Sequence, residues 1–200
     1  MKALLKKINR GVILSIIVIL CIVGYYVVLG IKTAPVRKEM ESLMTDFFGT
    51  YAQCAIVPKE YIKDNQTEEG IKPLLDSIHE KFEPYFSDEE SLDNFMKIYS
   101  DEQIYNQAIY QNNLITSLSV NFKKFQSTKV DFQKNTASST AVAAVDEKQV
   151  YYDLQWDENG KISSKQERSS NFKSDKSYSV TFTKINNKWL ITSFDYYRVY

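Results

Sequence analysis

The only histidine of the chain, His79, is the first candidate for chemistry because imidazole can move protons or bind metals near neutral pH. It lies on the flank of a helical stripe of apolar residues, four positions after Leu75. We expect a structural or exposed histidine at such a place. One histidine excludes the multi-histidine zinc sites, and no cysteine pair or Asp-x-Asp-x-Asp loop replaces them, so we expect no metal site.

Two acidic pairs, Glu89 with Glu90 and Asp101 with Glu102, are the next candidates, because paired carboxylates can divide acid and base roles. Each pair follows a serine at a predicted helix start, where the helix dipole stabilises negative charge. Helix capping therefore explains both pairs. The sequence has no G-x-S-x-G, no G-x-G-x-x-G and no phosphate-binding glycine loop. We expect no catalytic residue, no cofactor and no enzyme activity.

The cysteines and tyrosines are the remaining side chains that could take part in chemistry. Cys21 lies within a long apolar run and Cys54 well beyond it, so we expect no disulfide between them. Fourteen tyrosines are an unusual number for 200 residues. Tyrosine suits both half-buried sheets and protein interfaces, and both interpretations remain open.

Residues 11–31 are the feature that dominates the N-terminal part of the chain. They are 21 consecutive uncharged and mostly apolar residues, which as a helix would span about 31 Å, the thickness of the hydrocarbon layer. Basic residues precede this run directly: Lys2, Lys6, Lys7 and Arg10. Positive charge favours the cytoplasmic side. We therefore predict a cytoplasmic tail at 1–10, a transmembrane helix at 11–31 and an extracytoplasmic domain at 32–200, in the cell membrane.

A cleaved signal peptide is the alternative interpretation of the same run. Signal peptides have shorter apolar cores followed by a small-x-small cleavage site. Here the run is too long for a signal peptide and is followed by Ile31-Lys32-Thr33-Ala34-Pro35, a poor cleavage site. The uncleaved anchor is the prediction.

The charge balance of residues 32–200 bears on the partners of the predicted domain. These residues carry 21 basic and 25 acidic side chains. A net negative surface repels phosphate, so we expect no nucleic-acid partner.

Apolar residues at helical spacing predict three to four amphipathic helices between about 35 and 112. The first covers 36–51, with Thr33 and Pro35 suited to its start, and the second covers 71–82. Capping boxes at Ser87 and Ser100 predict the starts of two more helices.

After residue 112 the apolar residues alternate, which predicts five to six antiparallel strands in an α+β fold. Hairpin turns are predicted at Asn159-Gly160 and at Asn186-Asn187. The segment 161–176 is almost wholly polar. It is a long exposed arm of a hairpin or a mobile loop, and its edge could be solvated or could bind a partner.

The last hairpin carries a resemblance to a known superfamily. Within residues 178–196, a short turn precedes Lys188, then Trp189, and then the apolar residues Leu190 and Ile191. This pattern, with helices before strands over 36–200, resembles the nuclear transport factor two-like superfamily. The resemblance implies a cone-like domain in which helices pack on a curved antiparallel sheet.

Within that superfamily, a single N-terminal anchor with an extracytoplasmic domain is similar to the bitopic channel-assembly proteins of bacterial conjugation and type IV secretion. The resemblance implies a scaffold that binds other envelope or channel proteins and itself. One alternative is a small-molecule-binding or sensory domain that uses the cone interior. An isomerase or hydrolase is another, and it would need His79 or a buried aspartate facing that interior.

Overall fold

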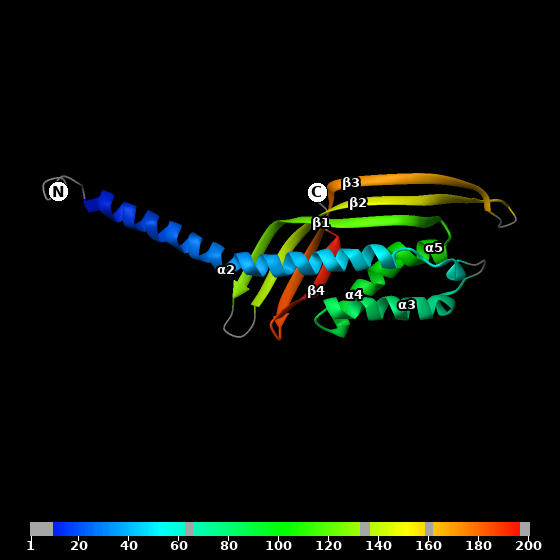
Figure 1. Cartoon of the computed structure of the whole chain (residues 1–200), viewed down its shortest axis with the longest axis horizontal. Helices are drawn as coiled ribbons and strands as arrows, with labels where there is room; N and C mark the ends of the chain where they lie inside the picture. The colour runs from blue at the N-terminus through cyan, green and yellow to red at the C-terminus, as the bar shows by residue number, and fades with distance from the viewer. Residues whose placement is uncertain (1–9, 63–65, 133–136, 159–161, 197–200) are drawn as a thin grey trace. The chain divides into compact units, whose positions relative to one another are not determined.

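The structure is a computed structural model that describes residues 10–62, 66–132, 137–158 and 162–196 (Figure 1). Helices come first and strands follow, which confirms the α+β prediction. The helical elements are α2 (Arg10–Cys54), η1 (Lys59–Tyr61), α3 (Glu68–Phe82), η2 (Glu83–Tyr85), α4 (Glu89–Tyr99), the π-helix η3 (Ser100–Tyr105) and α5 (Asn106–Ala108). The strands are β1 (Asn113–Phe132), β2 (Ala137–Trp156), β3 (Ile162–Ile185) and β4 (Lys188–Tyr196). The predicted turn at Asn159-Gly160 lies outside the described residues.

Helix α2 is continuous from Arg10 to Cys54, whereas the sequence predicted a new helix start near Thr33 and Pro35. The Thr33 hydroxyl donates back to the carbonyl of Leu29 at 2.9 Å instead of capping a new helix. Pro35 lies inside the helix, which continues through it although a proline there lacks a backbone donor and crowds the preceding turn. The prediction of a separate start was therefore wrong.

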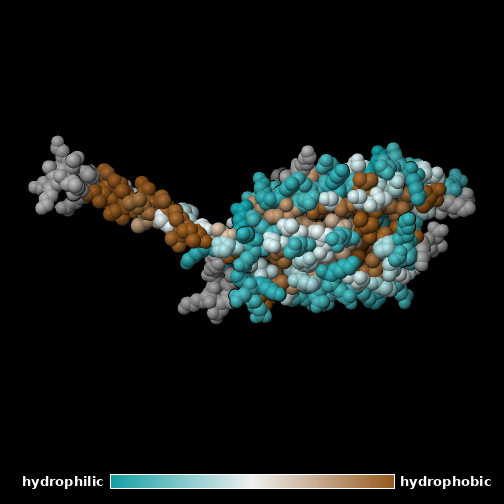
Figure 2. Space-filling view, viewed as in Figure 1, coloured by the Kyte–Doolittle hydropathy of each residue, from teal (hydrophilic) through white to brown (hydrophobic). Residues whose placement is uncertain are grey.

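The chain divides into two compact units, Met1–Glu39 and Met40–Tyr200. In the first unit, residues 11–28 are all exposed and nearly all apolar, and Figure 2 shows their surface in brown. This part of α2 is long and apolar enough to cross a membrane.

The core of the second unit is a cluster of aromatic rings. Phe47 of α2 is fully buried at its centre, with ring centroids 5.6 Å from Phe82 of α3, 5.4 Å from Phe95 of α4 and 4.9 Å from Phe194 of β4. Edge-on and tilted ring pairs of this kind add to the energy of apolar burial. One residue of α2 thus holds two helices and the last strand together.

Helices α3 and α4 begin at side-chain caps. The Thr67 hydroxyl accepts from the Gly70 amide at 3.1 Å, and the Asp88 carboxylate accepts from the Ser91 amide at 2.8 Å. The predicted capping box at Ser87 is therefore shifted by one residue to Asp88.

The second predicted capping box, at Ser100, was wrong. Ser100 is buried and has helical backbone angles, and α4 continues through it into the π-helix η3. A π-helical turn brings residues five apart onto one face. A regular helix would place Tyr99 and Ile104 about 140° apart around its axis, whereas the π-helical turn brings them closer to one face, and both are buried.

Gln107 of α5 joins the helices to the sheet. Its amide nitrogen donates to the carbonyl of Ala55 at 2.7 Å, and its amide oxygen accepts from the Ile115 amide of β1 at 2.9 Å. The side chain is buried, so both partners would lose their hydrogen bonds without it.

The described strands form one antiparallel sheet in the order β1-β2-β3-β4. Their number is four rather than five to six, because the strands are longer than predicted. β2 includes both 141–145 and 150–156, which the sequence pattern separates. The buried residues Ala141, Ala143 and Val145 are at odd positions, whereas Leu154 is buried at an even position, so the sequence pattern of this single strand resembles two separate strands.

The last hairpin was predicted correctly. Asn186 and Asn187 both have positive φ angles, 49° and 64°, as a two-residue type I′ turn requires. Ile185 pairs with Lys188 directly across the turn.

Candidate functional site

Three regions of the second unit are candidates for function: the space between helices and sheet, the outer part of the sheet, and the surface around His79. The first was the expected place for a ligand. A pocket there, lined by residues such as Tyr51, Tyr99, Tyr178 and Phe194, holds about 20 Å³. That volume is about that of a single water molecule. The aromatic rings of the core therefore fill the interior around this pocket, whereas a second pocket of about 460 Å³ lies between α4 and β4 near the surface.

The outer part of the sheet consists of residues 113–121 of β1, 146–156 of β2 and 162–172 of β3, and we call it the arm. Within the arm, β3 pairs with β2 alone, because β4 pairs with β3 only from Tyr178 to Ile185. Residues 162–172 therefore form an edge, and all but one of their side chains are exposed. This confirms that the polar segment is an arm of a hairpin over its described residues, rather than a loop.

The side chains of this edge are bonded back to β2. The Ser163 hydroxyl donates to the Gln155 carbonyl at 3.1 Å, and the Arg168 guanidinium donates to the Asp153 carboxylate at 3.0 Å. These bonds hold the side chains over the strand that already pairs with β3. The charge of Arg168 is thus directed away from the open edge.

Glu167 makes a similar link on the arm. A hydrogen bond to the Glu167 carboxylate, together with its negative charge, raises the pKa of Tyr152. Tyr152 is the residue of β2 that pairs directly with Glu167. The acidic side chain is therefore also occupied by the neighbouring strand.

A buried ion pair marks the inner end of the arm. The Lys176 ammonium lies 2.5 Å from the Glu147 carboxylate, which is 5% exposed. The same ammonium lies 4.9 Å from the centroid of the Phe172 ring. The register shift between Val145 and Asp146 falls at this point, so Lys176 sits where the sheet changes register.

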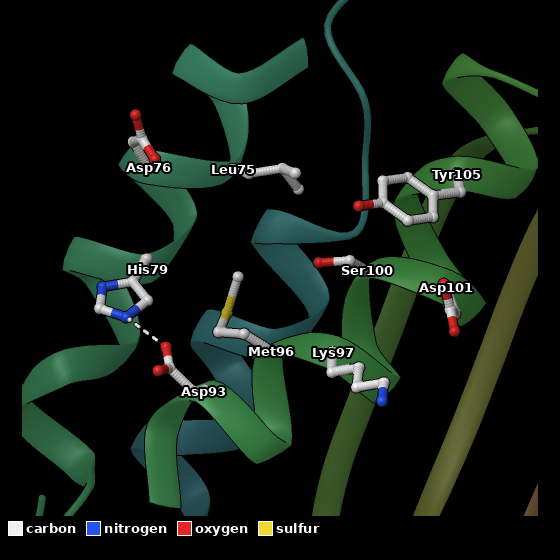
Figure 3. A pocket seen from close by; sticks show the side chains of 9 residues that line it. All are labelled: Leu75, Asp76, His79, Asp93, Met96, Lys97, Ser100, Asp101 and Tyr105. Carbon is white, nitrogen blue, oxygen red and sulfur yellow. Dashed lines mark ion pairs between the residues drawn. The ribbon is translucent and has the colours of Figure 1, made fainter. Parts of the chain in front are cut away.

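His79 lies at the wall of a surface pocket of about 500 Å³ between α3, α4 and η3 (Figure 3). Its Nε2 atom is 3.5 Å from a carboxylate oxygen of Glu89 and 3.4 Å from one of Asp93. The side chain is 28% exposed, between the structural and the exposed roles that we expected. It lies away from the aromatic residues that line the interior pocket.

The acidic pairs have different surroundings. Glu89 is in the first turn of α4, as predicted, but it also faces His79. Asp101 and Glu102 lie in the π-helix and not at a helix start. Asp93 was not singled out from the sequence. Its spacing of four from Glu89 is a signal that both lie on one helix face, but nothing in it points to His79.

Both cysteines are free, Cys21 exposed and Cys54 buried. Burial raises the pKa of the Cys54 thiol, although the charge of Lys81 opposes this. A protonated and buried thiol is a poor nucleophile. Cys54 therefore has the character of a core residue.

Comparison with known proteins does not assign the chain to a family. No protein-family model matches the chain, and no curated protein matches it. The functional argument therefore rests on the residues and the geometry of the three regions.

Proposed function

We propose that this protein is a non-enzymatic, membrane-anchored scaffold whose extracytoplasmic domain binds another envelope protein through the edge of β3 at residues 162–172. Residues 11–31 cross the cell membrane with the N-terminus in the cytoplasm, as the basic residues before them favour. The observation that carries the proposal is the open edge of the arm, eleven residues long and paired on one side only.

An open strand edge has unpaired backbone donors and acceptors, which another extended chain can satisfy by adding a strand. Soluble domains usually block such edges with proline, with short strands or with charges directed at the edge. Residues 162–172 contain no proline. The hydrogen bonds of Ser163, Glu167 and Arg168 to β2 leave the edge open to a partner.

The proposed occupant is an extended segment of another envelope protein. The edge carries Lys165 and Arg168 against Glu167, so it has little net charge and does not select a strongly charged partner. Backbone hydrogen bonds would then supply most of the affinity. The resemblance to channel-assembly proteins makes a subunit of a conjugation or secretion channel the first class of partner to test.

The interior of the domain favours a scaffold over ligand binding. A drug-sized ligand needs a cavity of about 300–1,000 Å³. The pocket within the aromatic core holds about 20 Å³. The pocket of about 460 Å³ between α4 and β4 has exposed residues such as Asn94, Lys97 and Ile98 in its wall, so it lies at the surface and not in the interior. None of the aspartates whose burial the structure describes is buried, and His79 lies outside the pocket in the aromatic core, so among these residues an enzyme of this kind would lack its expected acid or base.

Site-specific photocrosslinking in the native membrane tests this proposal. A photoreactive phenylalanine analogue replaces Lys165 or Asn171 on the edge, and Glu80 on α3, which is not part of the sheet, serves as an exposed control. We expect the two edge positions, and not the control, to form adducts with an extended segment of one envelope protein, identified by mass spectrometry. If the edge positions form adducts only with a second copy of this chain, the proposed partner is wrong and the edge joins two copies. If no adducts are specific to the edge, the proposal is overturned.

A further inference from the structure

Helices α3 and α4 bring three potential metal ligands together at the mouth of the 500 Å³ pocket. They are His79 of α3 with Glu89 and Asp93 of α4, and their ligand atoms all lie within 4.8 Å of one another. Glu89 and Asp93 are one helical turn apart, so both carboxylates project from the same face of α4. In Figure 3, His79 and Asp93 point toward each other across the gap between the helices.

The two separations from the histidine nitrogen match those of a tetrahedral site. With metal–ligand bonds of about 2.0–2.2 Å, tetrahedral geometry separates two ligand atoms by about 3.3–3.6 Å. The His79 nitrogen lies 3.5 Å from the Glu89 oxygen and 3.4 Å from the Asp93 oxygen. One imidazole with two carboxylates is also a donor set that Zn²⁺ and similar cations accept.

We infer that His79, Glu89 and Asp93 form a binding site for a divalent transition cation such as Zn²⁺, with water completing the coordination. Among the other described residues that line this pocket, Asp101 adds negative charge, the Asp76 carboxylate is paired with Lys72 at 2.8 Å, and Lys97 is the only lysine or arginine. Acidic walls raise the local concentration of cations.

The two helices that carry the ligands are packed firmly against each other. The rings of Phe82 on α3 and Phe95 on α4 pack at 4.7 Å between centroids, and both side chains are buried. The Asp88 cap fixes the start of α4 one residue before Glu89. A site whose ligands are held in place before the metal arrives loses little entropy on binding. A bound cation would in turn tie α3 to α4 and stabilise the domain.

The exposure of the two carboxylates determines how tightly we expect the cation to bind. The side chains of Glu89 and Asp93 are 72% and 66% exposed, so water competes for both of them. We therefore expect weaker binding than at closed structural zinc sites, together with exchange of the cation on dilution.

Calorimetric titration of the full-length chain in detergent, purified without a histidine tag, tests the site with Zn²⁺ as the probe. We expect one saturable cation per chain, a raised Tm, and visible absorption typical of tetrahedral Co²⁺ when Co²⁺ is used instead. His79→Gln and Asp93→Asn should each weaken binding at least tenfold and remove the Co²⁺ absorption.

Asp46→Asn is the matched control, because Asp46 of α2 is an exposed aspartate that neither lines this pocket nor belongs to the three ligands. It should bind Zn²⁺ as the wild type does. The inference is overturned if the wild type shows no saturable binding, or if His79→Gln, with its helix content intact by circular dichroism, binds as tightly as the wild type. The photocrosslinking result at the β3 edge does not bear on this outcome.

Discussion

The two halves of β3 have opposite environments although they belong to one strand. From Tyr178 to Phe182 the alternate side chains are buried against the aromatic cluster, and β4 pairs with this half. Residues 162–172 are almost all exposed and pair with β2 alone. The inner half therefore holds the domain together, while the outer half contributes little to stability and is free to make contacts. Substitutions in the two regions should differ by several kcal/mol.

The largest effect is expected from Phe47→Ala. Removing a fully buried ring from the centre of the cluster should cost about 3–5 kcal/mol of the free energy of unfolding. Phe172→Ala, on the arm, should cost less than about 1 kcal/mol, because its ring is exposed and contacts the Lys176 ammonium. Urea unfolding of the detergent-solubilised chain, followed by tryptophan fluorescence, measures both. Similar losses would contradict the division between core and arm.

The second largest loss of stability is expected from Gln107, which links the helices to the arm. Gln107→Leu leaves the carbonyl of Ala55 and the amide of Ile115 buried without their partner. We expect a loss of about 2–3 kcal/mol in the same unfolding experiment. Gln126→Leu is the control. The Gln126 side chain on β1 is exposed and donates to the Ser177 hydroxyl, so its loss should cost much less. Equal effects would show that Gln107 does not tie the helices to the arm.

A smaller loss is expected at the start of α4. Asp88→Ala removes the cap that accepts from the Ser91 amide and should cost about 1 kcal/mol. Asn94→Ala, which changes an exposed residue further along the same helix, should cost less.

The stabilisation that the Asp88 cap provides should also depend on pH. Hydrogen bonds from Ser87 and Ser91 lower the pKa of Asp88 below its ordinary value. Its stabilisation is therefore complete above the unfolded pKa and is lost as pH falls through the folded pKa. The difference between wild type and Asp88→Ala should shrink over that acidic range, as unfolding curves at several pH values can measure. A difference independent of pH would contradict the role of the carboxylate.

The smallest effect on stability is expected at the edge itself. Lys165→Ala should change the free energy of unfolding by less than about 0.5 kcal/mol, because the side chain is exposed. Hydrogen exchange sharpens the comparison within one strand. Amides in 162–172 should exchange faster than those in 178–185, which β4 also covers. Equal protection of both halves would mean that the arm is not a separate, weakly stabilised region.

Several elements were determined by local sequence. The run at 11–31 is long and apolar enough to span a membrane, whatever follows it. The turn at Asn186-Asn187 was predictable because both residues tolerate positive φ angles. The helices around Ile71 and Leu92 were predictable because their apolar residues recur at helical spacing.

Only the tertiary structure decided the rest, because it depends on contacts between residues far apart in the chain. Ser100 has the local pattern of a helix start, but burial of Tyr99 and Ile104 draws it into a π-helix. The meeting of His79 with Glu89 and Asp93 depends on how α3 packs on α4, which no spacing within either helix specifies. The open edge at 162–172 likewise exists because β4 is short and covers only the inner half of β3, a matter of pairing and not of composition.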